Sequence, residues 1–85
     1  MLVEIYTKDD CQYCMLAKTS LAKHMIQFNE YKLHHHFTRN EILEKYPEAK
    51  TFPIIVLDGF YIGGYTQLSK YLEEQFSSNK TLLNE

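Results

Sequence analysis

The sequence predicts an α/β fold in which three helices flank a four-stranded mixed sheet. Runs typical of strands and of helices follow one another as strand, helix, strand, helix, strand, strand, helix. An Asp-Gly pair joins the last two strands, which makes that half of the sheet antiparallel. Because 85 residues are too few for two ordinary domains, we expect a single domain over 1–85.

The first predicted strand and helix open the chain. Residues 2–6 are short, mostly apolar and rich in residues that favour strands. Apolar side chains then recur at helical spacing, which predicts a helix from about 12–28. We expect Met25 and Phe28 to belong to its buried stripe.

The next strand and helix complete the first half of the chain. Weak alternation over 31–37 predicts a strand, parallel to the first strand and reached by a right-handed crossover. Thr38 and Glu41 have the spacing of a capping box, which predicts a short helix that ends near Pro47.

The second half of the chain predicts a hairpin followed by a helix. Strands at 53–57 and 60–62 flank the Asp-Gly pair. Two glycines then end the second of these strands, and a last helix is expected to start at Tyr65 or Thr66. Residues 77–85 are mostly polar, and we expect a frayed or loosely docked tail there.

The composition excludes several classes of function. The net charge is −2, whereas nucleic-acid binding needs a basic surface, so we expect no nucleic-acid partner. No apolar run approaches the roughly 20 residues that span a bilayer, so we expect no membrane association. A signal peptide is not visible either, and we therefore expect a cytoplasmic protein.

The two cysteines are the main functional signal. A bridge between Cys11 and Cys14 would constrain the unfolded chain little, but a C-x-x-C pair in this setting predicts dithiol redox chemistry. Asp9 or Asp10 is expected to cap the following helix. The helix start and Lys8 should lower the thiol pKa of Cys11. We therefore predict that Cys11 attacks and that the more buried Cys14 resolves.

Other interpretations of the cysteines stay open at this point. Zinc needs two further ligands, but His24 is close and alone, and the histidines at 34–36 are adjacent to one another. Two inert core cysteines are the other alternative. Strand alternation would point His35 away from its neighbours, so we predict no metal site.

Three separated motifs closely resemble the dithiol glutaredoxins, above all their small bacterial and phage forms. The resemblance runs from residue 2 to about 76 and implies the thioredoxin-like fold. The motifs are Val3-Glu4-Ile5-Tyr6-Thr7-Lys8 leading into Cys11-x-Tyr13-Cys14, then Thr51-Phe52-Pro53, then Ile62-Gly63-Gly64 with Gln67-Leu68.

The resemblance implies that one side of a glutathione site surrounds the Thr51-Phe52-Pro53 motif. Pro53 would be a cis-proline that faces the dithiol, and the backbone of Phe52 would bind the cysteinyl part of glutathione. Lys8 would contact the glycine carboxylate or the thiolate, and Arg39 would also contact that carboxylate. The alternatives are a trans-proline at a strand edge and a solvated charge at Arg39.

The other side of the implied site lies at the start of the last helix. Gly63 and Gly64 would let the backbone approach glutathione closely, while the N–H groups of Tyr65 and Thr66 would hold its γ-glutamyl carboxylate. Tyr13 would form a wall of the site. The alternatives are a plain strand-to-helix turn and a packing role for Tyr13.

Three residues depart from the family pattern. Gln12 replaces the proline common between the cysteines, and Phe52 replaces a smaller aliphatic side chain. Thr66 replaces an aspartate that pairs with the α-amino group of glutathione in the family. Loss of that contact removes about 1–3 kcal/mol of binding free energy.

The predicted function is therefore that of a glutathione-dependent thiol–disulfide oxidoreductase. It would act as a monomer on protein disulfides and glutathione mixed disulfides, with glutathione as co-substrate and no tightly bound cofactor. The resemblance implies ribonucleotide reductase as an electron acceptor. The alternatives are a redoxin recharged by a thioredoxin reductase and a module that binds an iron–sulfur cluster.

Overall fold

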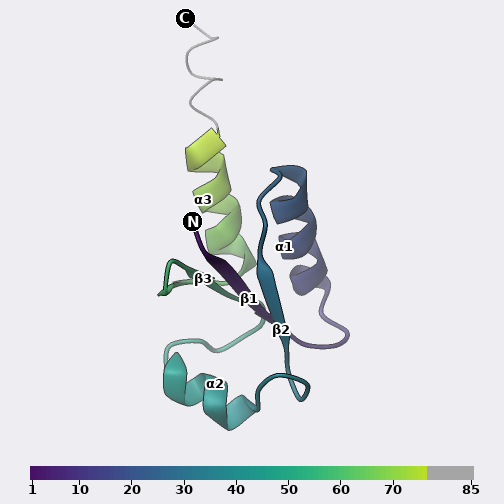
Figure 1. Ribbon diagram of the computed structural model, residues 1–85, viewed down its shortest axis with the longest axis vertical. Helices are drawn as coiled ribbons and strands as arrows, with labels where there is room; N and C mark the ends of the chain where they lie inside the picture. Colours follow the sequence, from purple (N-terminus) through teal and green to yellow (C-terminus); the bar gives the residue numbers. More distant parts are fainter. Residues whose placement is uncertain (77–85) are drawn as a thin grey trace, which may run out of the picture.

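The computed structural model describes residues 1–76, and the tail predicted at 77–85 lies outside this range (Figure 1). Its elements follow the predicted order. They are β1 (Val3–Thr7), α1 (Gln12–Lys23), β2 (Asn29–Lys32), α2 (Arg39–Lys45), β3 (Ile54–Leu57), β4 (Phe60–Gly63) and α3 (Tyr65–Phe76).

The four strands form one mixed sheet in the order β2-β1-β3-β4. β1 is parallel to β2 and antiparallel to β3, and β3 is antiparallel to β4. Ile5 lies near the middle of the sheet, opposite Glu30 on one side and Ile55 on the other. The predicted mixed sheet with three helices is therefore confirmed.

The sheet separates two apolar clusters, because successive side chains of a strand point to opposite faces. α1 and α3 cover one face, where Val3 and Ile5 pack with Leu21 and Leu68. The other face carries an aromatic cluster in which Tyr6 packs beneath α2. Figure 1 shows α1 and α3 lying together, with α2 at the other end of the molecule. The two elements that flank the cysteine loop, β1 and α1, therefore both contribute side chains to the core.

α1 ends at Lys23, five residues before the predicted end. Met25 has a left-handed φ of +58°, and the N–H groups of Met25 and Ile26 donate to helix carbonyls at 3.0 and 2.9 Å. This is a Schellman ending without the usual glycine. Met25 is 91% exposed, so its predicted place in the core is wrong, whereas Ile26 and Phe28 pack against the core. The apolar residues keep helical spacing beyond the end of the helix, which is why the helix was predicted to be too long.

β2 spans Asn29–Lys32, so the predicted strand over 31–37 starts two residues too late and ends five residues too late. His34 turns the chain with a φ of +72°, and its N–H donates to the carbonyl of Phe37 at 2.7 Å. Leu33 and Phe37 are buried at the two ends of this turn, and the three histidines between them are exposed. The prediction that strand alternation orients His35 is therefore wrong.

The hairpin and the capping box are confirmed. Asp58 and Gly59 both have positive φ values, of +50° and +87°, as a type I′ turn requires. At the start of α2, the N–H of Glu41 donates to the Thr38 hydroxyl oxygen at 3.2 Å. The Thr38 N–H donates to the Glu41 carboxylate at 2.8 Å.

We expect Thr38→Ala to lower the free energy of unfolding by about 1 kcal/mol, because the helix loses its N-cap acceptor. Urea denaturation of the variant and the parent protein measures this difference. Thr19→Ala is the matched control, since Thr19 is exposed within α1, and it should change stability by much less. Equal losses in the two variants would contradict the cap as the cause.

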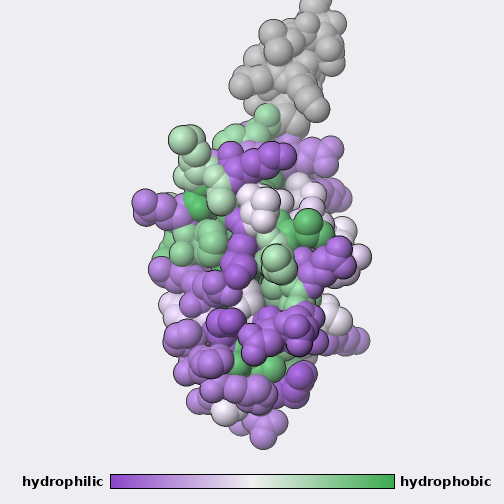
Figure 2. All heavy atoms as spheres, turned by 90° about the vertical axis from the view of Figure 1, so that its right-hand side faces the viewer, coloured by the Kyte–Doolittle hydropathy of each residue, from purple (hydrophilic) through white to green (hydrophobic). Residues whose placement is uncertain are grey.

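The surface of the described part is mixed in polarity. Figure 2 shows the side of the molecule that carries α1, where apolar side chains lie among polar ones. Tyr13, Met15 and Leu16 are exposed near the start of α1. Within residues 1–76, no helix has the length and apolar character needed to cross a membrane.

Candidate active site

Cys11 is the N-cap of α1. Its φ of −122° and ψ of 101° are extended, and its sulfur accepts the N–H of Cys14 at 3.1 Å. The predicted cap at Asp9 or Asp10 is therefore wrong. Asp10 instead turns the chain into the cysteine motif with a φ of +53°. Because the cap sulfur faces the free N–H groups of the first turn, this position favours negative charge on Cys11.

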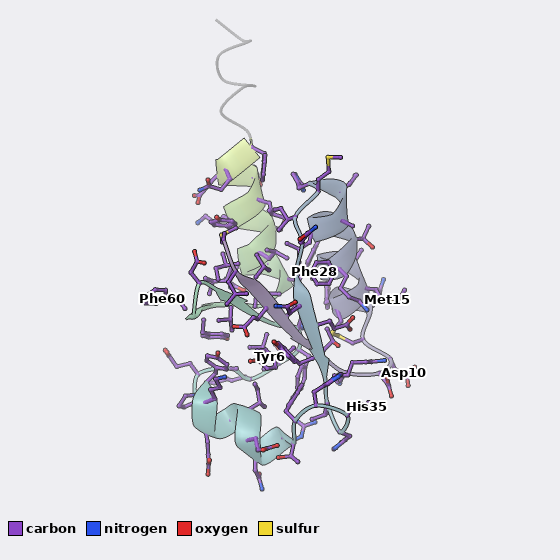
Figure 3. All side chains as sticks on the ribbon, viewed as in Figure 1. Tyr6, Asp10, Met15, Phe28, His35 and Phe60 are labelled. Carbon is purple, nitrogen blue, oxygen red and sulfur yellow. A yellow bond between two sulfur atoms is a disulfide. The ribbon has the colours of Figure 1, made fainter. Side chains whose placement is uncertain are left out.

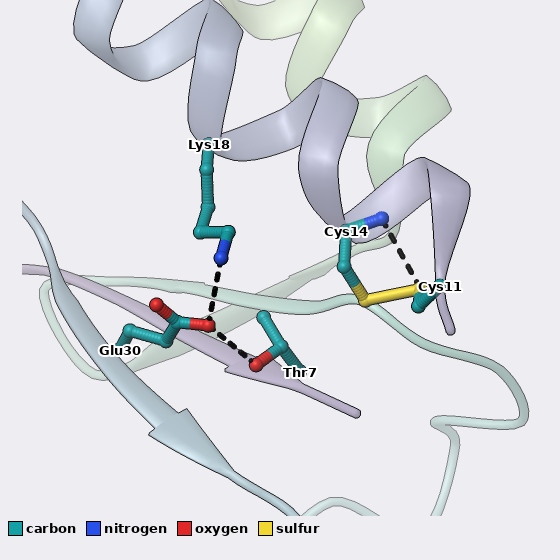
Figure 4. Close-up of a disulfide and its surroundings, with 5 residues drawn as sticks. All are labelled: Thr7, Cys11, Cys14, Lys18 and Glu30. Carbon is teal, nitrogen blue, oxygen red and sulfur yellow. Dashed lines mark hydrogen bonds and ion pairs between the residues drawn. A yellow bond between two sulfur atoms is a disulfide. The ribbon is translucent and has the colours of Figure 1, made fainter. Parts of the chain in front are cut away.

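Cys11 and Cys14 form a disulfide, with their Cα atoms 5.2 Å apart (Figure 4). Cys14 lies on the buried face of α1 and is 2% exposed, whereas Cys11 is partly exposed. A thiolate that approaches from solvent therefore meets the sulfur of Cys11. This asymmetry agrees with the predicted roles of the two cysteines.

A groove of about 600 Å³ lies beside the disulfide. It brings together most of the binding residues that the sequence predicted, from three separate segments. Those residues are Tyr13, Thr51, Phe52, Pro53, Gly63, Gly64, Tyr65 and Thr66.

The floor of the groove is formed where two loops approach closely. The Phe52–Pro53 peptide bond is cis and Pro53 is buried, so the trans alternative is wrong. A Cβ atom on Gly64 would lie 3.3 Å from the carbonyl oxygen of Pro53. Gly63 has a φ of +128°, which side chains rarely allow. The two glycines thus let the start of α3 lie against the cis-proline loop.

A second hollow of about 310 Å³ holds Cys11 together with Lys8 and Arg39. Tyr13 and Lys50 line both this hollow and the groove, so the two are neighbours. Every predicted site residue except the buried Cys14 lines one of the two.

Aromatic side chains form a wall of the groove. The rings of Tyr13 and Tyr65 stack with their centroids 5.8 Å apart and their planes at 27°. Tyr13 comes from the first turn of α1 and Tyr65 from the start of α3. The stack therefore joins the segment that carries the cysteines to the segment that carries the glycines.

Several residues of the site were not predicted from the sequence. Lys50 directly precedes the Thr51-Phe52-Pro53 motif, and this position beside the motif could have indicated that Lys50 belongs to the site. Gln67 belongs to the third motif but was not predicted as a site residue. It lines the groove, and its side-chain oxygen accepts the N–H of Gly64 at 2.9 Å. Glu48 and Tyr61 also line the groove, and no pattern in the sequence pointed to them.

Charge beside the cysteine loop comes from Asp9 as well as from the lysines. Asp9 forms an ion pair with Lys32 at 3.1 Å. The hydrogen bond from Lys32 and its positive charge hold the pKa of Asp9 below its usual range. Among residues 1–76, no three His, Cys, Asp or Glu side chains are arranged to hold a metal ion.

The fold and the cysteine pair together define the class of protein, a thiol–disulfide oxidoreductase with the thioredoxin-like fold. The family model described as Glutaredoxin matches residues 3–62. The chain therefore belongs to the glutaredoxin family.

Individual relatives agree with this assignment. Glutaredoxin 3 of Escherichia coli is 36% identical over 66 residues, which cover 78% of this chain and 80% of that protein. The glutaredoxin-like protein NrdH of Lactococcus lactis is 32% identical over 66 residues, with coverages of 75% and 88%. The crystal structure of glutaredoxin 1 from Francisella tularensis complexed with cacodylate has a TM-score of 0.75 at 26% identity. It covers 89% of this chain and 96% of that one.

Proposed function

We propose that the protein reduces glutathione mixed disulfides and protein disulfides with glutathione as co-substrate. The observation that carries the proposal is that the hollow at the exposed Cys11 adjoins the groove, which extends to the start of α3. We further propose that it works as a cytoplasmic monomer without a tightly bound cofactor. Following the family resemblance, ribonucleotide reductase is one electron acceptor.

The charges around the site suit the two carboxylates of glutathione. Lys8, Arg39 and Lys50 line the hollow at Cys11 and supply positive charge for the glycine carboxylate. At the other end, the N–H groups of Tyr65 and Thr66 start α3, where a carboxylate is favoured. The backbone of Phe52 lies between these two ends and suits the cysteinyl part.

The proposed reaction begins with the Cys11 thiolate. It attacks the glutathione sulfur of a mixed disulfide, so that Cys11 becomes glutathionylated and the substrate leaves as a thiolate. A second glutathione thiolate then attacks the glutathione sulfur on Cys11. Glutathione disulfide leaves and the Cys11 thiolate returns. With a protein disulfide, the Cys11 thiolate attacks one sulfur and forms a mixed disulfide with the protein. Cys14 then attacks the Cys11 sulfur and expels the reduced protein. Two glutathione thiols reduce the resulting Cys11–Cys14 disulfide and leave as glutathione disulfide.

The test is the reduction by glutathione of a mixed disulfide between glutathione and a small thiol. We expect turnover that saturates with the mixed disulfide. Absence of turnover above the uncatalysed rate would refute the glutathione dependence, and dithiol exchange with dithiothreitol would then be measured separately.

We expect Thr66→Asp to lower the KM for the glutathione mixed disulfide about tenfold, because a carboxylate there can pair with the α-amino group. Thr66 lines the groove and is exposed, so the change should be tolerated. Steady-state kinetics measure the effect. Thr19→Asp adds the same charge on α1 and should leave KM unchanged. An unchanged KM in Thr66→Asp would show that the α-amino group of glutathione does not lie beside residue 66.

A second candidate function is that of a redoxin recharged by a flavin-dependent thioredoxin reductase. Thr66 in the groove favours it, since the charged partner of the glutathione amino group is missing there. Turnover with thioredoxin reductase and none with glutathione would decide for this candidate.

A further inference from the structure

A charged network joins α1 to the sheet beside the buried cysteine. The ammonium of Lys18 binds the Glu30 carboxylate at 3.1 Å, and the Thr7 hydroxyl donates to the same oxygen at 2.7 Å. Figure 4 shows this network next to the disulfide, on the side of Cys14. Thr7 ends β1 and is 1% exposed, so the network reaches into the protein.

Lys18 and Cys14 are neighbours on the surface of α1. They are four positions apart in the helix, a spacing that brings their Cβ atoms to about 5–6 Å of each other. Lys18 retains a side-chain exposure of 34% and Glu30 of 26%, whereas Cys14 is 2% exposed. The Lys18 side chain therefore starts beside Cys14 on α1, and its ammonium is held on Glu30 next to the disulfide (Figure 4).

The chemistry requires negative charge on that buried sulfur. When a donor thiolate attacks the Cys11 sulfur, the Cys11–Cys14 bond breaks and its electron pair leaves on Cys14. The donor is oxidised into a mixed disulfide with Cys11, and Cys14 later takes a proton from solvent. In the reverse step the Cys14 thiolate attacks. Burial disfavours such an anion unless a positive charge is near.

We propose that Lys18 is the counter-charge of the Cys14 thiolate and that Glu30 and Thr7 are positioning residues that hold Lys18 there. This role rests on the proposed roles of the two cysteines but not on the preference for glutathione. It concerns only those steps in which the Cys11–Cys14 bond forms or breaks. Steps at Cys11 alone do not use it.

Glu30 is suited to anchor Lys18. Partial burial alone would raise the pKa of Glu30. The hydrogen bonds from Thr7 and Lys18, together with the positive charges of Lys18 and Lys32, outweigh the effect of burial. They hold the pKa of Glu30 below its usual range. Glu30 therefore stays ionised at neutral pH, and its negative charge partly offsets that of the ammonium. The effect on Cys14 should accordingly be moderate.

The direct test measures the thiolate of Cys14 in a Cys11→Ser background by its ultraviolet absorbance as a function of pH. We expect Lys18→Met to raise the apparent pKa of Cys14 by about one unit, which is a tenfold change in the thiolate fraction at low pH. Lys18→Arg should restore the original value. Lys23→Met removes the same charge from the exposed last turn of α1 and should change nothing.

A kinetic test separates this role from a structural one. Lys18→Met should slow the reduction of the Cys11–Cys14 disulfide by dithiothreitol about threefold to tenfold, since a leaving thiol of higher pKa leaves more slowly. Alkylation of Cys11 in a Cys14→Ser background should stay within about twofold. An unchanged Cys14 titration, or an equal shift in Lys23→Met, would overturn the proposal. Neither measurement uses glutathione. Failure of the proposed function would instead show as absent turnover in the mixed-disulfide assay with glutathione.

Discussion

Cys11→Ser should abolish the reduction of a glutathione mixed disulfide, whereas Cys14→Ser should retain much of it. Cys11 is the partly exposed N-cap of α1. In the proposed reaction it forms the bond to the substrate, and the buried Cys14 cannot replace it. Cys14 is 2% exposed and is needed only where an internal disulfide forms. The measurement is glutathione-dependent turnover of the mixed disulfide by each variant.

The two variants are controls for each other, because each one loses the disulfide and therefore the same cross-link. A protein disulfide is the second substrate, and there we expect Cys14→Ser to lose most of its activity as well. Retention of mixed-disulfide activity by Cys11→Ser, with loss in Cys14→Ser, would reverse the assigned roles. Thermal unfolding of both variants excludes a difference in folding.

The sheet was predictable because its burial pattern is regular. Val3 and Ile5 face α1 and α3, and Tyr6 faces α2, as alternation along one strand requires. The Asp-Gly pair fixes a two-residue turn, and both of its residues take the positive φ values that this turn needs. Local chemistry and the tertiary structure agree at these positions, so a single sequence sufficed.

The ends of α1 and β2 were not predictable from pattern. Met25 and His34 are not glycines, yet they take φ values of +58° and +72°. Neither side chain requires a left-handed conformation. Ile26, next to Met25, packs against the core. Leu33 and Phe37 are buried at the two ends of the turn that contains His34. Tertiary contacts therefore determine where α1 and β2 end. The cap at Cys11 was missed because Asp9 and Asp10 are the better cap residues by preference.

The binding groove was predicted where it rests on backbone and missed where it rests on side chains. Pro53 and Gly64 belong to motifs whose backbone must take one shape, and the structure brings them together. Glu48 and Lys50 come from a loop, and their place in the site depends on how α2 packs against the sheet. No local spacing encodes that packing.

We expect Gly63→Ala to lower the free energy of unfolding by about 2–4 kcal/mol. The φ of +128° alone costs an alanine on the order of 1–3 kcal/mol. The new Cβ would also lie 2.6 Å from the Gln67 Cγ, which must move and break the bond to the Gly64 N–H, worth about 1 kcal/mol. Thermal and urea unfolding should show a melting temperature lowered by roughly 10–30 °C.

Two further variants separate backbone strain from the clash with Gln67. Gly59→Ala meets a φ of +87° with no atom within 4 Å of the new Cβ, so it should lose only the conformational part. In a Gln67→Ala background, Gly63→Ala should likewise cost less than it does in the parent protein. Since Gly63 lines the groove, the single variant should also raise the KM for the mixed disulfide. Equal losses for Gly63→Ala and Gly59→Ala would show that Gln67 yields freely and that the close approach at Gly63 adds nothing to stability.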